Sequence, residues 1–233
     1  MLTMVTLNVN NVNIISFFLS IACYNTAMKS TESTKKTSPY HHGNLKESLL
    51  ETALEMVDKE GLESVTLRDL TQRLGTSRSA VYRHFESKEA LILGVIKRGY
   101  EQLDLLFTPI FQDTTQSVAE RFEKMGRAYL DFAIAHPNLY RLLFGENFRQ
   151  EREEICDYKD EKQATGLYAL IGLLLEAQEE GIIAQENPMI QAATVWASIH
   201  GLASLLIDGH LMMSDNLEAI YEYSQGVLLK GLR

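Results

Sequence analysis

The segment richest in side chains able to form directed hydrogen bonds is TSRSAVYRHFESKEAL, Thr76 to Leu91. It combines the cations Arg78, Arg83 and Lys88 with hydroxyl groups and a histidine. A guanidinium can donate two hydrogen bonds to guanine, a hydroxyl can bond several bases, and cations or hydroxyls can bond phosphate. These residue types therefore favour contact with nucleic acid over bond-breaking chemistry.

Charge is distributed unevenly along the chain of 233 residues, whose formal net charge is -9. Residues 1–28 carry no charge, whereas residues 29–100 have 12 basic and 10 acidic side chains, and residues 101–233 have 10 and 21. From Arg68 to Arg98 there are seven basic and three acidic side chains. This asymmetry predicts two modules with different partners, of which only the first is suited to an anion.

The elements that would position the basic segment are two short helices in succession. Thr66 is expected to cap the first, Gly75 to end it, and Ser77 to cap the second. Two short helices joined by a glycine-containing turn have the spacing of a helix-turn-helix, whose second helix enters the major groove of DNA. Ten side chains are predicted to contact DNA: Thr66, Arg68, Thr76, Ser77, Arg78, Ser79, Tyr82, Arg83, His84 and Lys88.

The rest of the chain reads as helical, and no segment alternates at the period of two that a strand needs. A first helix is expected between Asn44 and Gly61, and a longer one from Ser87 toward Leu106, with a boundary at Pro109. The fold class is all-α, with a three-helix DNA-binding domain at residues 40–104 and a larger helical domain at residues 105–233. Later helices are expected from Val118 to His136, from Pro137 to Gly145, from Tyr158 to Glu180, from Met189 to Ile207, and from Leu217 to Leu232.

Residues 1–39 are read as lying outside both domains. The apolar run from Ile14 to Cys23 is too short to span a bilayer, and residues 1–28 lack the basic residues of a signal peptide. Three readings stay open: translation begins at Met28, the segment is a disordered tail, or it is a targeting segment. Mass spectrometry of the native N-terminus distinguishes them.

Enzyme and metal functions find little support in the residues. No nucleophile elbow, zinc-protease, phosphate-loop or dinucleotide motif occurs, so no catalytic residue, cofactor or metal is predicted. Cys23 and Cys156 have no paired spacing and are read as free thiols in a reducing cytoplasm. A helical interaction module is the other alternative, but it would not explain how arginines and hydroxyls are placed before Phe85.

The segment GLESVTLRDLTQRLGTSRSAVYRHFESKEALI, Gly61 to Ile92, resembles the DNA-binding domain of the TetR family of bacterial transcriptional regulators. The matching features are Thr66, the turn before Ser77, Tyr82 with Phe85, and Lys88, and the resemblance extends upstream to YHHGNLKESLLETALEMV. It implies a homodimer that reads a palindromic operator, usually as a repressor; repressor and activator stay open because both dock in the same way.

The second half resembles, more weakly, a C-terminal domain of a TetR subgroup named for Trp, His and Gly, here Trp196, His200 and Gly201. Spacing places Trp196 and His200 on one helix face. In this family the C-terminal bundle holds a small effector. The candidate effector residues, each of which is also a plausible core residue, are Tyr129, Phe132, Tyr140, Phe144, Tyr168, Trp196 and His200.

Small residues at intervals of four suggest where a second copy of the chain packs. Ala193, Ala197 and Gly201 form such a row, and Gly226 lies in the last helix. Two helices from each copy would form a four-helix interface, although the row could also pack within one chain. The expected partners are therefore double-stranded DNA, an unidentified small molecule and a second copy, with no membrane. The helix from Ser87 to Leu106 is the expected lever between the two halves.

Overall fold

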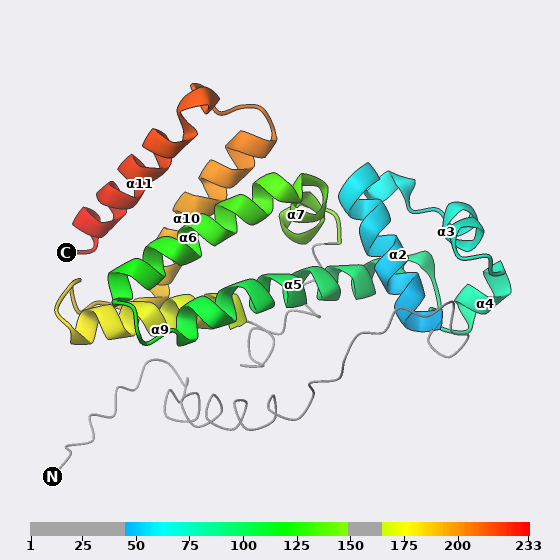
Figure 1. Ribbon diagram of the computed structural model, residues 1–233, viewed down its shortest axis with the longest axis horizontal. Coiled ribbons are helices and arrows are strands. Elements are labelled where there is room, and N and C mark those ends of the chain that lie inside the picture. The colour runs from blue at the N-terminus through cyan, green and yellow to red at the C-terminus, as the bar shows by residue number, and fades with distance from the viewer. Residues whose placement is uncertain (1–44, 149–164) are drawn as a thin grey trace, which may run out of the picture. The chain divides into compact units, whose positions relative to one another are not determined.

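The computed structural model describes residues 45–148 and 165–233, which belong to one compact unit, Gly43–Arg233. This part of the chain is helical and contains no strand, so the all-α expectation is confirmed (Figure 1). The helices are α2 (Leu45–Glu60), α3 (Leu67–Arg73), α4 (Arg78–Tyr82), α5 (Lys88–Gln112), α6 (Val118–Ala135), α7 (Pro137–Phe144), α9 (Thr165–Glu179), α10 (Pro188–Ile207) and α11 (Leu217–Gly231). Asn44, expected as a cap, and Tyr158, expected to start a helix, lie outside the described residues.

Side-chain caps fix the starts of the helices around the basic segment. Thr66 accepts a hydrogen bond from the Asp69 amide at 3.1 Å, and Ser77 accepts one from the Ala80 amide at 3.2 Å. Between them Gly75 has a φ of 60°, a left-handed conformation that glycine adopts without the steric cost of a Cβ. The predicted pair of capped short helices joined by a tight turn is confirmed.

The N-terminal helices α2, α3 and α4 belong to the same hydrophobic core as α5. α2 packs against α5, and Leu49 and Met56 on α2 are fully buried, as is Ile92 on α5. Val81 and Phe85 are 1% and 7% exposed, so they attach the short α4 to this core. A helix of five residues is unstable alone, which means that this burial is what fixes its orientation.

The expected boundary at Pro109 is wrong, because α5 continues through Pro109 to Gln112. Proline removes the bond that its amide would donate to the carbonyl of the residue four positions earlier, here Leu105. Leu105 is 68% exposed, so water can reach that side of the helix. Burial of Phe107 meanwhile keeps the last turns packed. The lever helix is therefore longer than its predicted end at Leu106.

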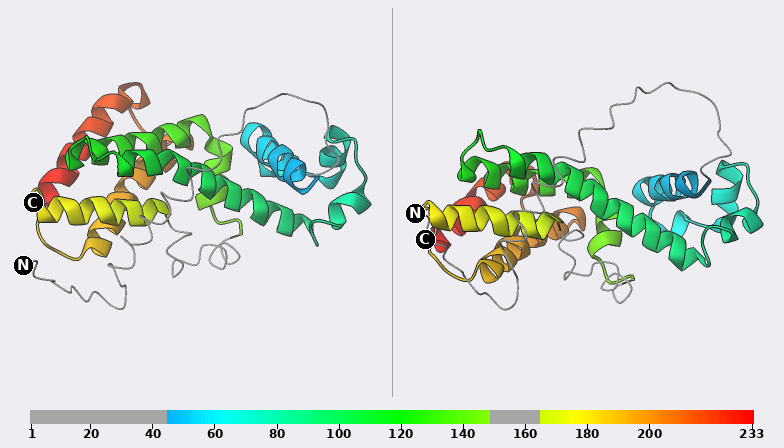
Figure 2. Two further views of the ribbon diagram at one scale, coloured as in Figure 1. Left: turned by 60° about the horizontal axis from the view of Figure 1, so that its bottom comes forward. Right: turned by 90° about the horizontal axis from the view of Figure 1, so that it is seen from below.

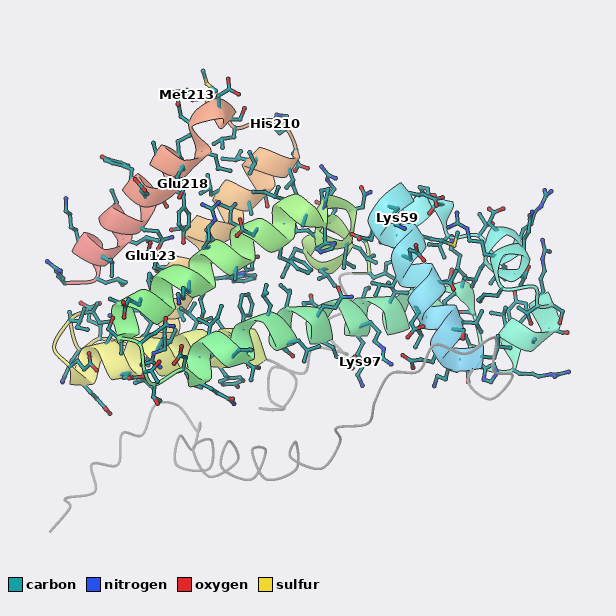
Figure 3. All side chains as sticks on the ribbon, viewed as in Figure 1. Lys59, Lys97, Glu123, His210, Met213 and Glu218 are labelled. Atoms are coloured by element: carbon teal, nitrogen blue, oxygen red, sulfur yellow. The ribbon has the colours of Figure 1, made fainter. Side chains whose placement is uncertain are left out.

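In the second half, α6 and α9 pack on the C-terminal part of α5, and α10 packs on α6 and α9 (Figure 2). Ser117 and Glu120 form a capping box at the start of α6. α11 is held to α6 by a 2.9 Å bond from the Tyr221 hydroxyl to the Glu123 carbonyl and by an ion pair between Arg127 and Glu218. Figure 3 shows Glu123 and Glu218 on these two neighbouring helices.

α10 is the only helix in residues 45–148 and 165–233 that is long and apolar enough to cross a membrane. Length and composition alone are weak indications, because the core helix of a globular bundle has the same features. Its residues Ala192, Ile199 and Ala203 are buried, and the helix packs against α6 and α9. Its apolar character is therefore accounted for in part by packing inside the bundle.

Candidate nucleic-acid interface and ligand cavity

The side chains predicted to contact DNA lie on α3, on α4 and its flanking turns, and at the start of α5. Tyr82 is 53% exposed although it is a large aromatic residue, whereas the neighbouring Val81 is buried. α4 thus has one face in the core and another toward solvent. The exposed members are Thr66, Arg68, Ser77, Arg78, Ser79, Tyr82, Arg83 and His84, while Thr76 and Lys88 are half-buried.

The cations of this face have no acidic partner within the described part of the chain. Those that form no ion pair there are Arg68, Arg78, Arg83 and Lys88. Nearby cations differ: Arg73 pairs with Glu60 at 2.6 Å, and Arg98 pairs with Glu47 and Glu101. Four cations without an ion pair therefore lie on the α3–α4 face, where a polyanion would be attracted.

The capping hydroxyls of this face already have partners in the protein. Thr66 donates to the Asp69 carboxylate at 2.6 Å while accepting the amide of the same residue. The Ser77 hydroxyl oxygen lies 2.9 Å from that of Ser79. Thr66 and Ser77 therefore serve first to position α3 and α4, which leaves Arg78 as the residue of the α4 N-terminus best placed to read a base edge.

Five of the seven candidate effector residues form one aromatic cluster that joins α6, α7 and α10. Ring centroids of Trp196 and His200 lie 5.5 Å apart, as their spacing on one face predicts, and those of Tyr140 and Phe144 lie 4.8 Å apart. The Tyr129 ring completes the cluster, 5.8 Å from that of Tyr140.

The other two candidates lie apart from this cluster. Phe132 is buried against His136, with ring centroids 5.1 Å apart. Tyr168 is half-buried on α9 and packs on the core.

A chain of hydrogen bonds runs through the cluster. Trp196 donates to the Tyr129 hydroxyl at 3.2 Å, that hydroxyl lies 3.0 Å from the Tyr140 hydroxyl, and the latter lies 2.6 Å from His200 Nδ1. Tyr129 donating to Tyr140, and Tyr140 to a neutral His200, gives every hydroxyl proton an acceptor. Burial lowers the pKa of His200 and raises that of Tyr129. It also raises the pKa of Tyr140 to about 12, so the neutral forms of all three side chains are favoured.

Beside this cluster is a cavity of about 150 Å³, here called the aromatic cavity. Its wall combines aliphatic side chains and two glycines with Asp104, Gln225 and six aromatic residues. The aromatic residues are Tyr100, Phe107, Phe122, Tyr129, Phe144 and Trp196. Three of these were predicted from the sequence; Tyr140 and His200 lie behind the Tyr129 hydroxyl and do not line the cavity.

The wall residues that the sequence did not predict come mainly from α5, α6 and α9. The assumed boundary at Pro109 obscured Phe107, and a periodic apolar pattern alone does not separate a wall residue from a core residue. Gln225 gave no signal in the sequence, because it follows the polar residues Glu222 and Ser224, and its burial becomes visible only in the fold. In the described ranges no three metal-binding side chains come together.

The residues predicted for dimer contact lie on the surfaces of α10 and α11. Ala193 and Ala197 are exposed, and a Cβ added at Gly201 or Gly226 would meet nothing within 4 Å. Exposed apolar side chains surround them, including Ile190 at 65%. The row of small residues therefore faces outward and is available to a partner.

Taken together, two capped short helices with an unpaired cationic face define the class of helix-turn-helix DNA-binding proteins. The family model "Bacterial regulatory proteins, tetR family" matches residues 49–95. A second model, "Tetracyclin repressor-like, C-terminal domain", matches residues 122–226. The chain belongs to the TetR family of transcriptional regulators. Membership of the Trp-His-Gly subgroup stays a prediction.

Relatives and solved structures agree with this assignment. Nucleoid occlusion factor SlmA of Vibrio cholerae serotype O1 is 32% identical over 115 residues, 49% of this chain and 58% of that protein. The match thus spans little more than half of the relative's length. A protein of unknown function from Rhodococcus sp. RHA1 superimposes with a TM-score of 0.68 at 26% identity, covering 84% of this chain and 99% of that one.

A further solved structure shows the same fold at lower identity. The fatty acid degradation regulator FadR from Bacillus halodurans superimposes with a TM-score of 0.61 at 17% identity. The match covers 81% of this chain and 100% of that one. At this level of identity the likeness extends to the fold alone.

Proposed function

We propose that the chain is a cytoplasmic, ligand-responsive repressor that binds a palindromic operator as a homodimer and leaves it when a small effector binds. The observation that carries the proposal is the unpaired cationic face: Arg78 at the start of α4 and Lys88 at the start of α5 form no ion pair within the described residues. Lys88 near a helix N-terminus is unfavourable for the helix dipole. A nearby phosphate would compensate for that cost.

Release would work through the distance between two recognition helices. In a dimer that reads two half-sites, these helices must lie about one helical turn apart, roughly 34–36 Å. α5 begins beside α4 and ends at the aromatic cavity, where Phe107 lines the wall. A ligand that favours a different position of α5 would favour a different spacing and so reduce operator affinity.

α7 is a second connection between the halves. At one end Asn138 donates to the Asp58 carbonyl of α2 at 3.1 Å, and His136 lies 3.0 Å from the Asp58 carboxylate. At the other end Phe144 lines the aromatic cavity. A rearrangement at the cavity would therefore be transmitted to α2 directly as well as through α5.

Two substitutions separate base reading from phosphate binding. Arg78→Ala should relax sequence preference, since a good bidentate contact discriminates by about 1–3 kcal/mol. Lys88→Ala should weaken binding to all sequences and reduce the slope of log affinity against log salt by about one. Fluorescence anisotropy with DNA that flanks the gene, at several salt concentrations, measures both.

Lys97→Ala is the matched control, because Lys97 is exposed on α5 about two and a half turns beyond Lys88 and so faces the opposite side. Figure 3 labels this residue. It should leave affinity and salt slope unchanged. Equal losses in all three variants would contradict the proposed division of roles.

A second candidate function follows from the relatives named nucleoid occlusion factor. With 32% identity over 115 residues, this chain could share the role that the name states. The aromatic cavity favours the ligand-responsive repressor, because a cavity of this kind suits an effector. Mapping occupied chromosomal sites decides between them: a repressor occupies few sites beside regulated genes, whereas sites spread along the nucleoid without transcriptional change would favour the second candidate.

A further inference from the structure

The aromatic cavity has a size that limits its occupant. Its volume is about 150 Å³. A space of about that volume accepts a benzene-sized molecule. Aromatic walls from α5, α6, α7 and α10 line this space, and a planar ring can meet them in edge-to-face or offset contact. The cavity therefore has room for one aromatic ring, and a longer ligand would extend through its open side toward solvent.

One polar atom in the cavity wall lacks a partner. The Gln225 side chain is 9% exposed, and its Oε1 is buried without a hydrogen-bond partner in the described part of the chain. The hydroxyls nearby are already engaged, since Tyr129 belongs to the hydrogen-bond chain and Tyr100 donates to the Leu143 carbonyl at 2.8 Å. A buried acceptor left unpaired costs free energy. Oε1 is not accessible from the cavity in this conformation, so a ligand donor would recover that free energy once the Gln225 amide turned toward the cavity.

Water is a poor substitute for that donor. A buried water needs two to four polar partners, and most of the cavity wall is apolar. The Tyr221 hydroxyl lies near Gln225 beside Gly126, but it already donates to the Glu123 carbonyl. A hydroxyl attached to a ring needs fewer partners, because the ring gains contact with the aromatic wall. A carboxylate would instead share the cavity with Asp104 and lose its hydration there.

We propose that the aromatic cavity binds a neutral, single-ring aromatic alcohol whose hydroxyl hydrogen-bonds to the Gln225 side chain. The ring lies between Phe107, Phe144 and Trp196, and the hydroxyl points toward α11. This assignment names the chemical class of the effector. The effect of the ligand on operator binding rests on the proposed function, whereas binding of the ligand to the cavity does not.

Isothermal titration calorimetry of the full chain with benzyl alcohol and toluene tests the assignment. Toluene has the same ring without the hydroxyl, so the ratio of the two dissociation constants isolates the polar contact. Gln225→Met keeps the length of the side chain and removes the amide. It should reduce the preference for benzyl alcohol about tenfold, and it should melt no lower than the wild type because an unpaired acceptor is removed.

Gln116→Met is the matched control. Gln116 Oε1 is also buried and unpartnered among the described residues, but it lies outside the cavity wall. This variant should keep the wild-type preference. An unchanged preference in Gln225→Met would overturn the proposal, as would tighter binding of benzoate or benzylamine than of benzyl alcohol.

A parallel operator titration separates this inference from the proposed function. Benzyl alcohol that binds in the calorimeter but leaves operator affinity unchanged supports the ligand class and contradicts effector-driven release. Absence of calorimetric binding by a chain that still binds its operator overturns the ligand class and leaves the DNA-binding role standing.

Discussion

His200 occupies the end of the hydrogen-bond chain from Trp196 through Tyr129 and Tyr140, and its protonation would break that chain. Tyr140 can donate to Nδ1 only while that nitrogen carries no proton. Burial lowers the pKa of His200 below its ordinary value of 6.5, so the folded protein keeps the ring neutral at a pH where the unfolded chain already binds a proton.

Stability should therefore fall with acidity in a defined window. As the pH decreases below 6.5, the unfolded chain takes up the proton first, and the free energy of unfolding decreases until the pH reaches the lower pKa of the folded state. His200→Gln keeps an acceptor for Tyr140 and removes the titration, so it should flatten this part of the profile. Urea unfolding between pH 7.5 and about pH 5 measures the effect.

His210→Gln provides the comparison, because His210 is exposed in the connection between α10 and α11, where Figure 3 labels it. That variant should keep the wild-type pH profile. A His200→Gln profile as steep as the wild type would show that the buried ring does not titrate as argued.

At the scale of elements, the crossing of α7 over α5 depends on a glycine. A Cβ added at Gly99 would lie 2.7 Å from Leu143 Cδ2 and 3.2 Å from Leu139 Cδ1, both on α7. Gly99→Val should therefore destabilise the fold by about 1–3 kcal/mol through overpacking. Thermal or urea unfolding measures the change.

Leu105→Val is the control for that substitution, because it introduces a β-branched residue on the same helix at a position that is 68% exposed. Its effect should be below about 0.5 kcal/mol. Valine forms helices better than glycine, so helix propensity would not account for a loss at Gly99. A Gly99→Val protein as stable as the wild type would contradict the close approach of α7.

The helix starts were predictable because they depend on local chemistry. Thr66 and Ser77 cap the two helices that their side chains and positions indicated. The boundary at Pro109 failed for a non-local reason, since burial of Phe107 keeps the helix intact beyond the point where sequence suggested a break.

The candidate site was predictable only in part for the same reason. The spacing of four residues on one helix predicts that Trp196 and His200 lie together. Which aromatic rings line the cavity depends instead on how six helices pack, and the sequence pattern does not show that. Gln225 shows the limit most clearly: its neighbours in the cavity, such as Phe122 and Phe107, are about a hundred residues distant in sequence.

For the whole molecule, the proposed dimer depends on the outward row of small residues on α10. Ala197→Arg would place a charge in the centre of the proposed interface, and an unpaired buried charge is strongly unfavourable. The variant should therefore be monomeric at concentrations where the wild type is dimeric, with its helical content retained. Light scattering after size-exclusion chromatography measures the mass.

Ala135→Arg is the matched control, because Ala135 is exposed at the end of α6, away from the row. It should remain dimeric. A dimeric Ala197→Arg protein would mean that the row packs elsewhere, and a monomeric wild type would contradict the dimer itself.

Footprinting of the DNA that flanks the gene tests the central claim, that the α3–α4 face of a dimer reads an operator, most directly. We expect protection of two inverted half-sites whose centres lie one helical turn apart, about 10–10.5 base pairs or a multiple of it. Protection should disappear with Arg78→Ala at a protein concentration where Lys97→Ala still protects. A footprint over a single half-site, or one that Arg78→Ala leaves intact, would contradict it.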